Sequence, residues 1–198
     1  SEKIRDNPTQ SSYLQFLTRV TQSAHLFHDL GVGPRDAVTY LLPNLPQTHF
    51  TLWGAEATGI ANPINPLLEA EQIGAILRET NAKVVVTLRP FPKTDVAEKT
   101  AEAVALAPNV KTVLEVDLLR YITGLKKFIV PMIRPKRSVS NQATYKNFNE
   151  EMEKQPKTLQ FEDPQEDRVC CYFHTGGTTG MPKVAQHKYS GIIYNGWV

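Results

Sequence analysis

Apolar residues recur at three- and four-residue steps in the first regular stretch of the chain. Between Ser12 and Leu30 these side chains fall on one face of a helix. Gly31 follows the stretch, and Ser11 precedes it as a candidate N-cap whose hydroxyl can accept a hydrogen bond from a free backbone amide. We therefore predict an amphipathic helix over residues 12–30.

Short apolar runs then alternate with helical patterns. The predicted strands are 37–42, 60–64, 83–88 and 110–116, and the predicted helices between them are 46–58, 70–80 and 95–107. Because Val84, Val85 and Val86 are apolar without alternation, helices should cover both faces of their strand. The alternation predicts an α/β fold with a mainly parallel sheet flanked by helices.

The alternation ends at residue 118. Residues 118–149 contain no acid and these basic side chains: Arg120, Lys126, Lys127, Arg134, Lys136, Arg137 and Lys146. We expect 118–150 to be a basic, apolar excursion from the sheet. Its part 119–137 mixes cations with apolar residues, and two prolines exclude one long amphipathic helix. Two interpretations stay open: a peripheral contact with anionic membrane headgroups through 119–137, or a solvated linker with some core anchors.

The pattern becomes regular again after the excursion. A polar helix is predicted around 145–154, and an acidic linker then leads into a strand over 168–173. The last ten residues, 189–198, have a helical pattern that stops without a cap or breaker. We interpret the sequence as a fragment of a longer chain.

Overall composition excludes several classes of protein. With 22 Lys and Arg against 20 Asp and Glu, the formal charge of +2 lacks the electrostatic footprint of a nucleic-acid binder. Cys170 and Cys171 are adjacent, which suits neither a disulfide framework nor a metal site. No apolar run approaches the roughly 20 residues that cross a bilayer. These features favour a soluble, cytoplasmic protein.

A glycine- and threonine-rich loop follows the strand at 168–173. It reads His174-Thr175-Gly176-Gly177-Thr178-Thr179-Gly180-Met181-Pro182-Lys183. Glycines let backbone amides approach a ligand, threonines add hydroxyls and the lysine adds a positive charge, which together suit a polyphosphate. The mononucleotide kinase loop is excluded because Val184 follows Lys183. Pro182 favours extended backbone before it, so the loop should lead into a strand over 184–187.

This run closely resembles the Thr-Ser-Gly-Thr-Thr-Gly-x-Pro-Lys-Gly signature of adenylate-forming enzymes, which include acyl-CoA synthetases, peptide-synthetase adenylation domains and luciferases. Residues 41–46, Gly54, Gly59 and residues 62–66 resemble an upstream conserved region of acyl-CoA synthetases. Where the signature has Ser, this chain has Gly176. We expect the substitution to weaken the side-chain grip on phosphate while keeping the backbone cradle.

The resemblance implies the N-terminal portion of the acyl-CoA synthetase-like large domain, with 1–198 as part of it and the C-terminal domain absent. It implies that a carboxylic acid reacts with ATP in the presence of Mg2+ to give an acyl-adenylate, from which CoA displaces AMP. The implied phosphate-binding residues are Thr175, Gly176, Gly177, Thr178, Thr179, Gly180 and Lys183. Lys183 would act as an electrostatic clamp, and no residue of this fragment is assigned as catalytic or as a metal ligand.

A fatty acid is the preferred substrate. The family's later motifs for adenine, ribose and the adenylation lysine are not found in these residues, so the fragment alone is not expected to catalyse the reaction. Two other classes stay open: a non-catalytic nucleotide-binding or scaffolding module derived from this family, and a structural α/β interaction domain. Among the histidines, His174 is the one to test because it adjoins the loop.

Overall fold

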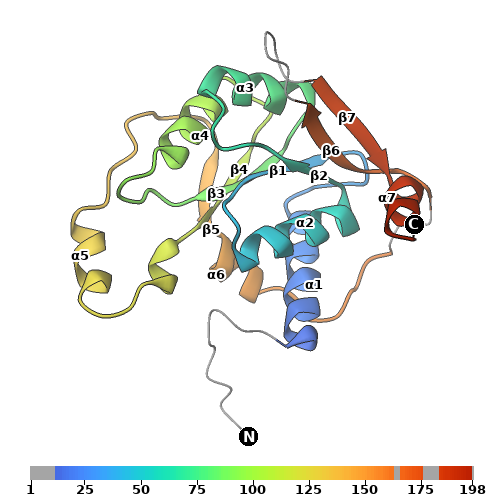
Figure 1. Ribbon diagram of the computed structural model, residues 1–198, viewed down its shortest axis with the longest axis horizontal. Coiled ribbons are helices and arrows are strands. Elements are labelled where there is room, and N and C mark those ends of the chain that lie inside the picture. The colour runs from blue at the N-terminus through green and yellow to red at the C-terminus, as the bar shows by residue number, and fades with distance from the viewer. Residues whose placement is uncertain (1–11, 163–165, 176–182, 198) are drawn as a thin grey trace, which may run out of the picture.

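The computed structural model describes residues 12–162, 166–175 and 183–197 (Figure 1). Its strands form one sheet in the order β5-β4-β3-β1-β2-β6-β7. The strands are β1 (Ala37–Leu41), β2 (Ile60–Pro63), β3 (Val84–Leu88), β4 (Thr112–Val116), β5 (Thr144–Asn147), β6 (Val169–Thr175) and β7 (Lys183–Lys188). Neighbouring strands are parallel except for the antiparallel pair β6–β7. The predicted mainly parallel sheet is confirmed.

Helices cover both faces of the sheet (Figure 1). They are α1 (Tyr13–Asp29), α2 (Pro46–Thr58), α3 (Ala70–Glu79), α4 (Val96–Ala105), α5 (Lys126–Met132), α6 (Phe148–Glu153) and α7 (Tyr189–Trp197), with a short 3-10 helix at Leu118–Tyr121. Val84 and Val86 pack in the core beneath α1, α2 and α6, whereas Val85 packs in the core beneath α3 and α4. Helices on both faces explain why this strand is uniformly apolar.

The N-cap of α1 is Ser12, one residue after the predicted Ser11, which lies outside the described residues. The Ser12 hydroxyl accepts a hydrogen bond from the Gln15 amide at 3.2 Å, and the Ser12 amide donates to Gln15 Oε1 at 2.7 Å. This reciprocal pair is a capping box. The spacing of three residues to Gln15 is what distinguishes the two adjacent serines.

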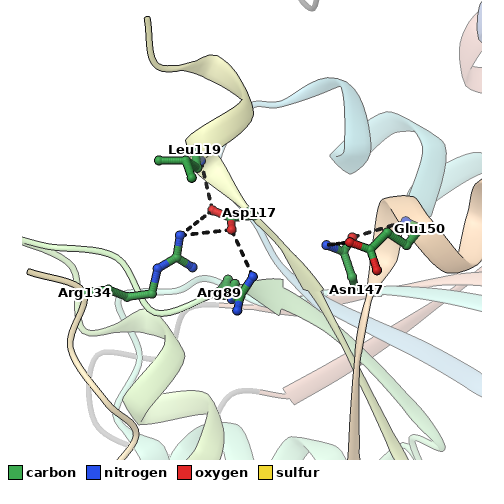
Figure 2. Close-up of polar contacts among 6 residues, drawn as sticks. All are labelled: Arg89, Asp117, Leu119, Arg134, Asn147 and Glu150. Carbon is green, nitrogen blue, oxygen red and sulfur yellow. Dashed lines mark hydrogen bonds and ion pairs between the residues drawn. The ribbon is translucent and has the colours of Figure 1, made fainter. Parts of the chain in front are cut away.

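The prediction of a helix over 145–154 is wrong at its start. Residues 144–147 instead form β5, which pairs with β4 at the edge of the sheet. The helix α6 begins at Phe148, where the Asn147 side chain accepts a hydrogen bond from the Glu150 amide at 3.2 Å (Figure 2). The strand lacks an apolar run because its side chains are exposed or half-buried. Pairing with β4, rather than local preference, therefore determines this strand.

The other predicted elements begin and end within two residues of their observed bounds. Cys170 and Cys171 are buried and are not joined to another cysteine. Among the described residues, no helix has the length and apolar character needed to cross a membrane.

Candidate functional site

The two ends of the glycine- and threonine-rich loop are held together by the sheet. Thr175 ends β6, Lys183 begins β7, and these residues pair in the antiparallel register. The chain therefore enters a strand after the loop, as Pro182 predicts. Because β6 is parallel to β2 and β1, Thr175 lies at the edge formed by their carboxyl ends, where open α/β sheets bind ligands.

The remaining predicted phosphate-binding residues lie outside the described residues. They are Gly176, Gly177, Thr178, Thr179 and Gly180. Of the predicted set, the structure thus brings together Thr175 and Lys183 through their backbones, and the Lys183 residue is exposed.

A buried hydrogen-bond network supports the strand that leads into the loop. His174 Nε2 lies 2.7 Å from Asn62 Oδ1. The Asn62 amide nitrogen donates to Thr39 Oγ1 at 2.7 Å and to Thr80 Oγ1 at 3.2 Å. Because Asn62 uses its NH2 group for the threonines, its oxygen accepts from His174, which assigns the ring proton to Nε2. The network joins β6 to β2, β1 and the end of α3.

The assignment leaves His174 Nδ1 as an acceptor. This atom is buried and has no hydrogen-bond partner among the described residues. Burial lowers the pKa of His174 below its ordinary value, with the negative charge of Glu79 opposing the shift, so the ring is neutral at pH 7. The ring therefore serves here as a neutral, oriented support one residue before the loop.

Asn62 belongs to the block that resembles the upstream region of acyl-CoA synthetases, and two glycines of that block also have structural roles. A Cβ added to Gly54 would lie 2.7 Å from Ser23 Cβ, so Gly54 lets α1 and α2 pack closely. A Cβ added to Gly59 would lie 2.5 Å from the Asp36 carbonyl oxygen. Residues of this block therefore determine how α1 packs on α2 and how β2 lies beside the turn at Asp36, and they support the strand that leads into the loop.

Replacing Asn62 with alanine should lower the free energy of unfolding by about 2 kcal/mol, because it leaves buried groups of Thr39, Thr80 and His174 without their partner. Urea denaturation measures the change. Asn195→Ala, at an exposed position of α7, is the matched control and should stay within about 0.5 kcal/mol of the unsubstituted protein. Equal effects of the two substitutions would contradict the role of the network.

A second polar cluster, which is partly buried, fixes the start of β6. Arg168 donates to the backbone oxygens of Gly59 at 2.5 Å and Glu56 at 2.6 Å. The hydroxyl of Tyr189 also donates to the Glu56 backbone oxygen. The Tyr189 hydroxyl thus contacts α2. Neither Arg168 nor Glu56 was identified as a site residue from the sequence, because a single charged residue beside apolar residues is not a distinctive pattern.

The Glu56 side chain should make stability depend on pH. Burial raises its pKa from 4.5 to about 7, although the positive charge of Arg168 opposes the shift. The folded state therefore binds a proton more tightly than the unfolded state between these two values. The free energy of unfolding should fall as pH rises through this window, by roughly 3 kcal/mol.

Urea denaturation across this pH window, on the protein and on Glu56→Gln, tests the prediction. The glutamine variant should lose this part of the pH dependence. Glu71→Gln, at an exposed position of α3, should keep it. A glutamine variant whose stability follows pH as steeply as the unsubstituted protein would show that Glu56 is not responsible.

Among the described residues, no group of three His, Cys, Asp or Glu side chains lies close enough together to bind a metal ion.

Comparisons with known proteins agree on one family. Residues 2–198 match the family described as AMP-binding enzyme. The marinolic acid–CoA ligase of Pseudoalteromonas sp. (strain SANK 73390) is 36% identical over 193 residues, covering 96% of this chain and 26% of the relative. The long-chain-fatty-acid–CoA ligase of Bacillus subtilis (strain 168) is 26% identical over 192 residues, covering 93% of this chain and 33% of the relative.

A solved structure shows the same fold. An anthranilate–CoA ligase in complex with anthranoyl-AMP superposes with a TM-score of 0.68 at 21% sequence identity, covering 88% of this chain and 29% of that one. The chain thus spans about a quarter to a third of the length of the proteins that it matches.

Proposed function

Because the chain belongs to the AMP-binding enzyme family, we propose that it is the nucleotide-binding N-terminal part of an acid–thiol ligase. In the proposed reaction a carboxylate oxygen attacks the α-phosphate of ATP, forming an acyl-adenylate and releasing pyrophosphate. The thiol of CoA then attacks the acyl carbon, forming a thioester and releasing AMP.

The strand–loop–strand arrangement carries this proposal. Thr175 and Lys183 are paired across the two strands, at the edge of the sheet where α/β folds bind ligands. In the proposal, the loop's backbone amides and hydroxyls hold the β- and γ-phosphates, and Lys183 adds a positive charge that stabilises the departing pyrophosphate. In the proposal, Mg2+ would enter bound to the phosphates of ATP.

A fatty acid is the proposed substrate class. The Bacillus subtilis relative is a long-chain-fatty-acid–CoA ligase, and the Pseudoalteromonas relative also joins an acid to CoA. We propose a cytoplasmic location, which the free thiols of Cys170 and Cys171 support because they suit a reducing compartment.

The test is ATP–pyrophosphate exchange with a panel of carboxylic acids, run on the 198-residue chain and on the protein from the complete reading frame. We expect exchange with fatty acids by the longer protein, and CoA-dependent release of AMP. No exchange with any acid would overturn the proposal and favour a non-catalytic nucleotide-binding module. Exchange without CoA-dependent release would overturn the assignment of CoA as the acceptor.

A further inference from the structure

The excursion that follows β4 carries an apolar surface that the rest of the described chain does not cover. Within α5 only Val130 is buried, whereas Leu125 is 80% exposed and Met132 86%. The exposed apolar side chains of this surface, here called the α5 surface, are Leu125, Phe128, Ile129, Met132 and Ile133. Contiguous exposed apolar side chains of this kind mark interaction sites in soluble proteins.

The cations of the excursion divide into two groups. Three contact acidic side chains within the fold: Arg134 with Asp117, Arg137 with Glu115, and Lys146 with Glu151. Four others are exposed, namely Arg120, Lys126, Lys127 and Lys136, and of these Lys126 and Lys127 lie in α5 itself. Because residues 118–149 contain no acid, the α5 surface combines apolar side chains with a positive charge that no acid of the same segment balances.

The inward group holds the excursion against the sheet. Arg134 donates to both carboxylate oxygens of Asp117 at 3.0 Å, and Arg89 donates to one of them at 3.2 Å (Figure 2). Burial alone would raise the pKa of Asp117, but the hydrogen bonds from Arg134 and the Leu119 amide outweigh it and lower the pKa. The Arg137 guanidinium also lies 3.7 Å from the centre of the Tyr145 ring. The base of α5 is therefore fixed while its surface faces outward.

We propose that the α5 surface docks on an anionic lipid bilayer. The apolar side chains would enter the boundary between headgroups and acyl chains, and the exposed cations would contact anionic headgroups. Lys126 and Lys127 directly precede Phe128, so charge and apolar side chains meet within one helical turn, and long lysine side chains can reach headgroups beside a buried ring.

Charge distinguishes a bilayer from a second copy of this chain. A symmetric dimer through the α5 surface would place Lys126 and Lys127 of both copies in one interface, since a two-fold interface uses one patch twice. Like charges placed together oppose association, whereas an anionic bilayer attracts them.

The position of the α5 surface is compatible with the proposed enzyme. The excursion follows β4 towards one end of the sheet, while β6, which ends at Thr175, lies towards the other end (Figure 1). Docking on a bilayer would therefore leave the nucleotide side accessible. The inference does not rest on the proposed function, because a non-catalytic module with this surface would dock in the same way.

Vesicle co-sedimentation tests the proposal on the 198-residue chain and on the protein from the complete reading frame. Both should bind phosphatidylcholine vesicles that contain about one-third phosphatidylglycerol, and bind pure phosphatidylcholine vesicles at least tenfold more weakly. Binding should weaken in high salt. Lys126→Gln/Lys127→Gln should lower the binding constant at least tenfold, and Phe128→Ser/Met132→Ser should do so as well.

Matched controls keep the test specific. Leu67→Ser removes an equally exposed apolar side chain elsewhere, and Lys93→Gln/Lys157→Gln removes two exposed cations elsewhere. These variants should bind like the unsubstituted protein, and urea denaturation should give every variant the same midpoint. The proposal would be overturned if the control variants lost as much vesicle binding as the α5 variants. It would also be overturned if the protein bound no vesicles but self-associated, and the α5 substitutions abolished that self-association. Binding by the short chain but not by the longer protein would show that the protein's own residues cover the surface, which also overturns it.

Discussion

Replacing Lys183 with alanine is expected to lower ATP–pyrophosphate exchange by roughly 100- to 1000-fold in the protein from the complete reading frame. In the proposed reaction negative charge moves onto the departing pyrophosphate, and the ammonium group stabilises that charge more in the transition state than in bound ATP. The loss should therefore appear mainly in the maximal rate of exchange, and less in the concentration of fatty acid needed for half of it.

The matched control lies at the opposite end of the same strand. Lys188 ends β7, is exposed, and lies 3.9 Å from Asp167 in a surface ion pair of the kind that contributes little to stability. Lys188→Ala should leave exchange within about twofold of the unsubstituted protein. If both variants lost activity equally, the positive charge of β7 as a whole, rather than Lys183 at the loop, would be responsible.

The sequence predicted the alternation of strands and helices well because each element has a strong local signal. Apolar runs marked the central strands, and Pro46 marked the start of α2. The edge strand β5 has no such signal, since Thr144 and its neighbours gain their order from pairing with β4. Its residues therefore resembled the beginning of the polar helix that follows.

The candidate site was also predictable only in part from the sequence. The loop from Thr175 to Lys183 is recognisable because its chemistry is contiguous in sequence. Its support is not, since Asn62 and His174 are 112 positions apart and each alone is an ordinary polar residue. The block containing Asn62 carried a signal through its resemblance to acyl-CoA synthetases, but only the fold shows that this asparagine bonds to the strand before the loop.

The charge of the excursion shows a further limit of sequence reasoning. Counting residues gave an acid-free basic segment, and the open question was membrane contact or solvated linker. The acids that neutralise part of it, Glu115 and Asp117, lie in or directly after the buried strand β4. Their pairing with Arg137 and Arg134 depends on how the excursion folds back, so the sequence overstated the number of outward cations.

Gly59→Ala is expected to lower the free energy of unfolding by about 4 kcal/mol, the largest loss of stability that we predict. The added Cβ would lie 2.5 Å from the Asp36 carbonyl oxygen and 2.8 Å from that of Gly33, closer than real Cβ contacts. These are backbone atoms, so no side-chain rotation relieves the clash.

The turn that carries these oxygens has little freedom to move. The Asp36 carbonyl accepts from the Ile60 amide and the Gly33 carbonyl accepts from the Asp36 amide, both at 2.9 Å. The Asp36 side chain is in turn held by Lys83 at 2.7 Å. Shifting the turn would break the hydrogen bonds that start β1 and β2 side by side, which is why the cost should exceed that of ordinary overpacking.

Urea denaturation of Gly59→Ala beside Gly191→Ala tests this expectation. A Cβ at Gly191 meets nothing within 4 Å, and alanine is a better helix former than glycine in α7, so the control should be neutral or slightly more stable. A Gly59→Ala variant within about 1 kcal/mol of the unsubstituted protein would mean that the turn at Gly33 and Asp36 yields easily. The backbone that positions β2, and with it the hydrogen bond between Asn62 and the strand before the loop, would then deform more easily than the hydrogen bonds of the turn indicate.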